Sequence, residues 1–518
     1  MNALRALAGA GLLVVAAGLV VTSGSLESGA SARAQPNRPI ATATPDPNDI
    51  RANNSPTIVA NPVDPGNLVV VNRVDTPTYG CALRISDDGG VTWREGALPF
   101  PDGEELPARC FAPDAGFGSD GTLHVVFATL KGRGNSPNAV WSASSPDGGD
   151  SFSVPTKVLG RLSFQVRLLV DPTTPGRLYL SWLAAESVGV ALFPTTNNPI
   201  TVARSDDGGT TWGQGVRVSP PTRQRVVAPS MALDDDGRLL VLYMDLGDDR
   251  LDYNGGHGWR AGLPYGGTWS IVLARSSDEG ASWEEQVVDD AVVPTKRFLI
   301  FLPQSPSLAV DPRTGRVYVG FADGRLGDPD VWVRTADGAG QSFADRQKVN
   351  DTADGDGRDQ YLPRLAVAPG GRLDVVYYDR RADPANVLNQ VSFQSSHDDG
   401  ASFGEARQLA SMAFDSRIGF GSWRGLPDLG SRLGLLSTDT TARAVWTDTR
   451  AGTEQTNKQD LASAVIEFAP ASSWRNPLRL VGWLVGLFGV AVAATSVVGR
   501  PSGATWANSD EPTGAPTM

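Results

Sequence analysis

Apolar and polar positions alternate in short stretches along most of the chain, and the stretches come in pairs. In "APSMALDDDGRLLVLYM" (228–244), an apolar stretch is followed by an Asp-Gly turn segment and then by an alternating stretch. This pattern predicts a β-hairpin, because side chains of a strand point to opposite faces in turn and Asp and Gly favour tight turns. The same unit recurs at 55–71, 112–128, 167–183, 305–321 and 362–378, and in a looser form at 425–448.

An eight-residue motif, which we call the box, lies between these hairpins. "SDDGGTTW" (205–212) is preceded by an alternating stretch, "ITVARS". Successive boxes are about 60 residues apart, which suits a unit of four strands. The chain is therefore predicted to be all-β, a β-propeller of four-stranded blades. The other boxes lie at 86–93, 145–152, 276–283 and 396–403, and an altered copy with one extra residue lies at 335–343.

The number of hairpins predicts seven blades. Six is the alternative, if the looser unit at 425–448 is something else. The last unit ends with "LASAVIEF" (461–468) and lacks a fourth strand, whereas "RPIATA" (38–43) precedes the first unit without a partner. We expect this segment to complete the last blade, because a closed ring leaves no open sheet edge. The propeller is predicted to span 35–468.

Each residue type in the box has a structural role. Asp and Ser side chains accept hydrogen bonds from nearby backbone N–H groups, and Gly adopts angles that other residues avoid. The final Trp or Phe buries a large apolar face. A motif in six equivalent places cannot be one active site, so we expect a bracing role for its aspartates, Asp88, Asp147, Asp207, Asp278, Asp337 and Asp398.

Both ends of the chain predict contact with a membrane. Residues 1–34 begin with a positively charged segment, continue with an apolar stretch and end in a small-residue cleavage site after Ala34. This is the pattern of a secretory signal peptide or an N-terminal anchor. After a linker at 469–477, the apolar segment 478–499 is long enough for a transmembrane helix, and a polar tail follows at 500–518. We expect a cell-membrane protein with its propeller on the extracellular side. The net charge of −12 argues against nucleic acid as a partner.

The boxes resemble the Asp-box, or bacterial neuraminidase repeat, of the sialidase superfamily of β-propellers, over about residues 38–468. The resemblance implies a cell-surface sialidase-like protein, an exo-glycosidase of the glycoside hydrolase class that acts on sialic-acid-type or related glycans. The alternative is a non-catalytic propeller that binds glycans or surface proteins. Enzymatic activity stays open, because the family's Phe/Tyr-Arg-Ile-Pro motif is replaced by "NRPI" (37–40).

The strand order places the functional face opposite the boxes, where the loops are rich in charge. Cys81 and Cys110 both map to that face. An even pair of cysteines in an exported chain predicts a disulfide, with two separate buried thiols as the alternative.

The resemblance also implies a set of site residues. Sialidases hold the substrate carboxylate with three arginines and use a Tyr–Glu nucleophile pair and an Asp acid/base. Here the candidates for catalysis are Tyr361, Glu454 and Asp379. Arg325, Arg380, Arg450 and Arg297 are the candidates for binding the carboxylate. Because Asp–Arg pairs recur at the ends of strands, a structural ring between the blades is the alternative for these arginines.

One loop suggests a weak calcium site, and otherwise no metal or cofactor is expected. In "NDTADGDGRDQY" (350–361) carboxylates recur at short spacing, but Arg358 occupies a ligand position and no Glu closes the loop. An acidic surface loop is therefore the preferred interpretation. The four candidate ligands are Asp351, Asp354, Asp356 and Asp359.

Overall fold

The computed structural model describes most of residues 32–468. The described ranges are 32–40, 49–102, 109–131, 136–185, 198–249, 265–295, 304–338, 340–419 and 428–468. The predicted helix at 478–499 and nearly all of the predicted signal at 1–34 lie outside them. Within the described ranges every regular element is a β-strand, and no helix is long and apolar enough to cross a membrane.

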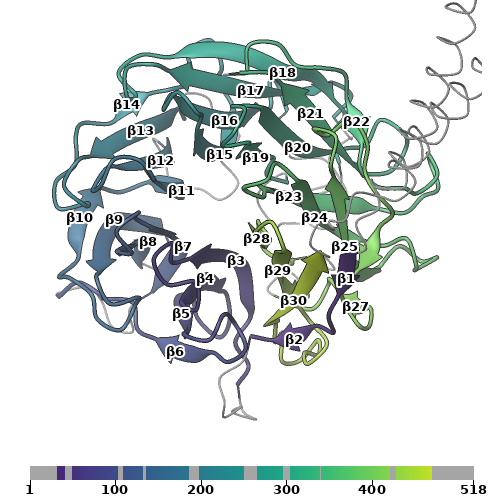
Figure 1. Ribbon diagram of the computed structural model, residues 1–518, viewed down its shortest axis with the longest axis horizontal. Helices are drawn as coiled ribbons and strands as arrows, with labels where there is room; N and C mark the ends of the chain where they lie inside the picture. Colours follow the sequence, from purple (N-terminus) through teal and green to yellow (C-terminus); the bar gives the residue numbers. More distant parts are fainter. Residues whose placement is uncertain are drawn as a thin grey trace, which may run out of the picture. The chain divides into compact units, whose positions relative to one another are not determined.

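The strands form seven antiparallel sheets, which Figure 1 shows arranged around one axis. From the axis outward, blade 1 contains β3 (Asn53–Ala60), β4 (Leu68–Val74), β5 (Gly80–Ser86) and β6 (Arg94–Gly96). Blade 2 contains β7 (Cys110–Phe117), β8 (Leu123–Lys131), β9 (Ser136–Ser145) and β10 (Thr156–Leu159). Blade 3 contains β11 (Ser163–Val170), β12 (Leu178–Ala184), β13 (Ile200–Ser205) and β14 (Val216–Arg217).

The second half of the ring follows the same plan. Blade 4 contains β15 (Val226–Leu233), β16 (Leu239–Asp245), β17 (Trp269–Ser276) and β18 (Glu284–Val292). Blade 5 contains β19 (Ser307–Val310), β20 (Val317–Asp323), β21 (Asp330–Ala336) and β22 (Gln347–Lys348). Blade 6 contains β23 (Gln360–Val367), β24 (Leu373–Asp379), β25 (Leu388–Ser396) and β26 (Arg407–Gln408), with β27 (Phe414–Asp415) also paired to β25.

Blade 7 joins the two ends of the propeller. It contains β28 (Gly434–Ser437), β29 (Thr441–Asp448) and β30 (Asp460–Phe468), and on the outside β1 (Ala32–Ala34) and β2 (Arg38–Pro39). In β2, Arg38 lies opposite Ser463 of β30, and the Ile40 N–H donates to the Leu461 carbonyl at 2.8 Å. The predicted seven blades and the closure by the segment that begins at Arg38 are confirmed. Cleavage after Ala34 would remove β1 and leave β2.

Apolar side chains on both faces of each blade pack against the neighbouring blades. Val69 and Val71 of β4, for example, pack in one cluster with Leu123 and Val125 of β8. The cores therefore lie between blades, which explains why the second strand of each blade is apolar on both faces. This packing fixes the angle between blades and so the position of every loop around the axis.

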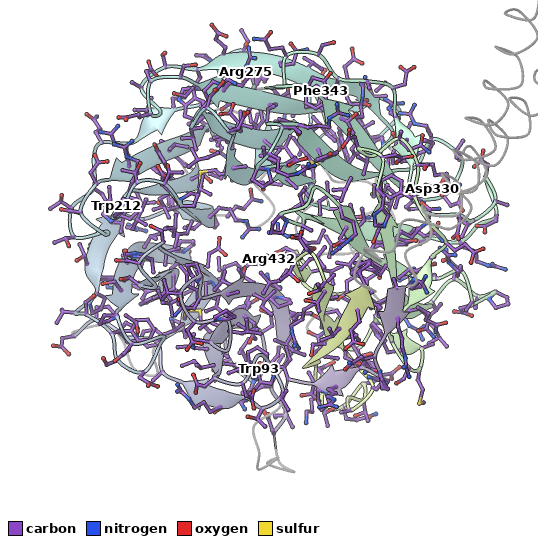
Figure 2. The ribbon with its side chains drawn as sticks, in the orientation of Figure 1. Trp93, Trp212, Arg275, Asp330, Phe343 and Arg432 are labelled. Atoms are coloured by element: carbon purple, nitrogen blue, oxygen red, sulfur yellow. A yellow bond between two sulfur atoms is a disulfide. The ribbon has the colours of Figure 1, made fainter. Side chains whose placement is uncertain are left out.

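Five boxes form the same hydrogen-bonded turn between the third and fourth strands. In the box of blade 4, Ser276 Oγ donates to Asp278 Oδ1 at 2.7 Å and the Gly280 N–H donates to Ser276 Oγ at 2.7 Å. The Ser282 N–H and hydroxyl donate to the two oxygens of Asp278 at 2.8 and 2.6 Å. In the altered copy, Asp337 instead pairs with Arg316 at 2.7 Å. Figure 2 shows Trp93, Trp212 and Phe343 near the outer edge, so the boxes brace the rim.

Loss of the contacts at the closure should destabilise the whole ring. Ile40 is 3% exposed and packs between blades 7 and 1. Replacing a buried Ile by Ala removes apolar contacts and leaves a cavity, so Ile40→Ala should cost about 2–5 kcal/mol of unfolding free energy. Urea denaturation measures this cost. Val63→Ala, at a position 62% exposed, is the control and should change little; equal effects of the two variants would contradict the closure.

Candidate functional site

The strand directions place the predicted site residues on the face opposite the boxes. Arg325, Arg380 and Arg450 follow the second strands of blades 5, 6 and 7, and Glu454 lies in the loop after β29. Asp379 ends β24 and Tyr361 is the second residue of β23. Arg297 lies outside the described residues.

Two of the predicted arginines form ion pairs with the aspartate two residues earlier. Arg325 Nη2 is 2.5 Å from Asp323 Oδ2, and Arg450 Nη2 is 2.5 Å from Asp448 Oδ2. Each arginine also reaches the preceding blade: Arg325 donates to the Ala291 carbonyl at 2.6 Å, and Arg450 donates to the hydroxyl of Ser411 at 2.8 Å. These contacts favour the structural ring between blades over a carboxylate clamp.

In blade 6 the aspartate pairs with a different arginine from the predicted one. Asp379 is fully buried, and Arg381 rather than Arg380 is its partner, at 2.5 Å. Arg381 also reaches the preceding blade, where Asp351 lies 2.5 Å away. Arg380 instead pairs with Asp359 at 3.2 Å. Backbone spacing alone does not determine which of two adjacent arginines faces a carboxylate.

The three predicted catalytic residues have different surroundings. Glu454 is exposed, whereas Asp379 is buried and forms an ion pair with Arg381. The Tyr361 hydroxyl is buried and donates to Asn389 Oδ1 at 2.7 Å. Burial raises the pKa of Tyr361 to about 12, against the lowering effect of Arg380. A nucleophile needs an accessible oxygen and a lowered pKa, so these surroundings favour a packing role for Tyr361.

The four aspartates of the suggested calcium site do not converge. Asp351 pairs with Arg381, Asp354 with Lys348 at 2.8 Å, and Asp359 with Arg380. Asp356 accepts the N–H of Arg358 at 2.8 Å. Among the described residues no group of three or more His, Cys, Asp and Glu side chains could hold a metal. The geometry therefore favours the acidic-loop interpretation.

A cluster outside the predicted set of site residues lies where the inner strands of blades 7, 1 and 2 begin. We call Arg73, Asp75, Tyr79, Phe111 and Asp428 the mouth cluster. The guanidinium carbon of Arg73 lies 4.9 Å from the centre of the Phe111 ring, and the Tyr79 and Phe111 rings meet edge to face at 5.7 Å. Both aromatic rings are partly exposed. The disulfide between Cys81 and Cys110, whose Cα atoms are 5.4 Å apart, joins β5 to β7 beside this cluster, as expected for the pair.

The mouth cluster contains two buried carboxyl groups beside one guanidinium. Arg73 Nε lies 2.7 Å from Asp75 Oδ1, and Arg73 Nη2 lies 3.9 Å from Asp428 Oδ1. Burial and the nearby charge of Asp75 raise the pKa of Asp428 to about 7, although Arg73 opposes the shift. Burial alone would lower the pKa of Arg73, but the two carboxylates raise it. The cluster therefore combines a cation with a carboxyl group that holds its proton more tightly than an ordinary aspartate does.

Three further arginines surround the axis, and we call Arg167, Arg364 and Arg432 the axial arginines. Arg167 and Arg364 lie in the inner strands β11 and β23, and Arg432 precedes the inner strand β28. Figure 2 shows Arg432 beside the axis. The sequence signal was a charged residue inside an apolar strand, as in "FQVRLLV" and "YLPRLAV". The mouth cluster and the axial arginines together hold four arginines and two aspartates, and a third aspartate, Asp114, lies 4.0 Å from Arg432 Nη2, in a chain of net charge −12.

Comparisons with known proteins give likenesses in structure only. No family model and no curated protein matches the sequence. A protein of unknown function from Dyadobacter fermentans is 15% identical, with a TM-score of 0.46, covering 85% of this chain and 99% of that one. An α-L-arabinanase of Penicillium chrysogenum complexed with arabinobiose is 16% identical, with a TM-score of 0.42 and coverage of 71% and 96%. A mutant of the NanB sialidase of Streptococcus pneumoniae is 13% identical, with a TM-score of 0.39 and coverage of 84% and 71%.

The raised pKa of Asp428 predicts a dependence of stability on pH. Because the folded state holds this proton more tightly than the unfolded chain, the stability it contributes is complete below about pH 4 and is lost as the pH rises through about 7. Asp428→Asn mimics the protonated form, so its unfolding free energy should fall less between pH 5 and pH 8 than that of the wild type. Urea denaturation at the two pH values measures the difference.

The exposed turn residue Asp64 provides the control for this experiment. Asp64→Asn should keep the pH dependence of the wild type. An Asp428→Asn protein that loses as much stability as the wild type over this range would contradict the shift.

Proposed function

We propose that this chain is a sialidase-like propeller at the cell surface that recognises acidic glycans at its mouth cluster. The observation that carries the proposal is the partly exposed Arg73–Phe111–Tyr79 arrangement on the face opposite the boxes. Ligand sites combine aromatic surface with a few placed polar groups, and a guanidinium matches the geometry of a carboxylate. An acidic sugar offers both an apolar ring face and a carboxylate to such a site.

The charge around the axis supports an anionic ligand. The mouth cluster and the axial arginines form a positive region inside a strongly acidic chain, and fields of this kind raise the local concentration of ligands of opposite charge. A neutral glycan would gain nothing from this field. We therefore favour acidic glycans over neutral ones.

The surface location rests on the two terminal segments and on the disulfide. The signal at the N-terminus would export the propeller, and the apolar segment 478–499 would anchor it in the membrane. A disulfide between Cys81 and Cys110 suits an oxidising compartment outside the cell. Glycans or surface proteins are the partners that such a location offers.

Hydrolysis of the glycan is the second candidate function, and Asp428 favours it. A carboxyl group that keeps its proton near neutral pH suits general acid catalysis. The Asp428 carboxyl is buried, so a hydrolase of this kind would need the mouth cluster to open around the substrate.

Binding is tested on an array of acidic and neutral glycans with the purified full chain. Arg73→Met should weaken binding of acidic glycans by about tenfold or more, because a charge-assisted hydrogen bond contributes about 1.5–3 kcal/mol. Tyr79→Ala should also weaken binding, and it should disturb the buried Arg73–Asp75 ion pair less than Arg73→Met does. The control Arg316→Met removes an arginine from the box face and should bind like the wild type. Unchanged binding in both Arg73→Met and Tyr79→Ala would overturn the proposed site.

Hydrolysis is tested with a fluorogenic sialoside. If the chain is a hydrolase, the wild type releases the fluorophore, Asp428→Asn abolishes release, and Tyr361→Phe retains it because the Tyr361 hydroxyl is buried against Asn389. A wild type without turnover that still binds acidic glycans would reject the hydrolase and keep the recognition function.

A further inference from the structure

The axial arginines surround a small cavity in the middle of the ring. Its volume is about 30 Å³, and its lining comes from the inner strands of blades 3 to 6 and the segment before β28. Pro229, Ser230 and Ser307 contribute short side chains to the lining, so the three guanidiniums are its longest polar groups. About 10–15 Å³ of such volume holds one water molecule. The cavity therefore admits a water-sized ion and excludes a sugar ring.

The position of Arg167 and Arg364 follows from a shared irregularity of the inner strands. Most inner strands contain a register shift near their start, which interrupts their pairing with the second strand of the blade. After this interruption, one residue of the inner strand is the first to pair again. In blades 3 and 6 this residue is an arginine, whereas other blades carry smaller side chains there. The equivalent residues are Thr57, Asp114, Arg167, Ser230 and Arg364.

The charge of Arg167 disfavours the charged forms of Arg364 and Arg432. Burial, and then the charge of Arg167, lower the pKa of Arg432 to about 9. Burial also lowers the pKa of Arg364 and of Arg167, and Arg167 lowers that of Arg364 further. Guanidinium groups keep their proton in proteins, because their intrinsic pKa exceeds about 12. Relief from this repulsion must therefore come from a nearby negative charge.

Asp114 supplies only part of that negative charge. Its two oxygens accept hydrogen bonds from the Thr57 hydroxyl at 2.8 Å and from the Leu168 N–H at 3.0 Å. Arg432 Nη2 is 4.0 Å from the nearer oxygen, beyond hydrogen-bond distance. Within the described part of the chain, the Nε groups of Arg364 and Arg432 are buried without a hydrogen-bond partner. One carboxylate thus faces three guanidiniums, two of which have N–H groups left over.

We propose that the axial cavity binds a small monovalent anion of halide size, held by Arg167, Arg364 and Arg432. Such an anion fits the volume, accepts the unpaired N–H groups and reduces the repulsion between the guanidiniums. Buried charges are costly unless they are paired, so the anion is a structural part of the ring. This site is distinct from the mouth cluster, and its test does not require a glycan to bind there.

An anion that binds only the folded state stabilises it in proportion to its occupancy. The full chain should therefore unfold at a higher temperature as chloride replaces gluconate, an anion too large for the cavity, at constant ionic strength, with a saturating dependence. Arg364→Met should weaken the apparent chloride affinity by about tenfold or more, because it removes one charge-assisted donor. Asp114→Asn should instead strengthen it, because the competing carboxylate is gone. Arg316→Met, on the box face, serves as the matched control and should retain the wild-type chloride dependence.

Crystals of the full chain grown with bromide give a second readout that does not depend on a variant folding. The anomalous signal should show one bromide between the three guanidiniums. A cavity without bromide, or a chloride dependence that Arg364→Met leaves unchanged, would overturn the proposal.

Discussion

The pairing of β2 with β30 is the interaction on which the rest of the structure depends. It joins a strand from the start of the propeller to the last strand, so that seven sheets close into one ring. In a closed ring the inner strands of all blades face a single axis. Residues from blades 1, 2, 3, 6 and 7, which are far apart in the sequence, then meet there as the mouth cluster and the axial arginines.

The two faces of the ring differ in how closely they follow the repeat. On one face, five boxes form nearly identical turns, in which a single aspartate accepts the N–H and hydroxyl of the same downstream residue. On the other face and along the axis, equivalent positions carry different residues, from Thr57 and Ser230 to Arg167 and Arg364. Repeated groups maintain the scaffold, whereas a site for one ligand requires that the repeat be broken.

The sequence predicted the features that recur locally. The hairpin pattern and the box spacing predicted blades of four strands, and the unpaired segment at Arg38 predicted the closure, because strand alternation and turn chemistry act over a few residues. The sequence predicted Arg380 as the partner of Asp379, but the structure pairs Asp379 with Arg381. The partner depends on the direction of the side chain, which the sequence does not give. It also missed Asp428 and the axial arginines, because their surroundings form only when distant blades converge. A charged residue inside an apolar strand, as at Arg364, was the available signal.

The central claim is that ligand recognition occurs at the mouth cluster and not at the boxes. Hydrogen–deuterium exchange of the full chain, with and without a sialylated oligosaccharide, tests it directly, because amides buried or ordered by a ligand exchange more slowly. The account predicts slower exchange at Gly80–Ser86 and at the start of Cys110–Phe117, with no change in the boxes at 276–283 and 396–403. Slower exchange confined to the boxes, or none at the mouth cluster, would contradict it.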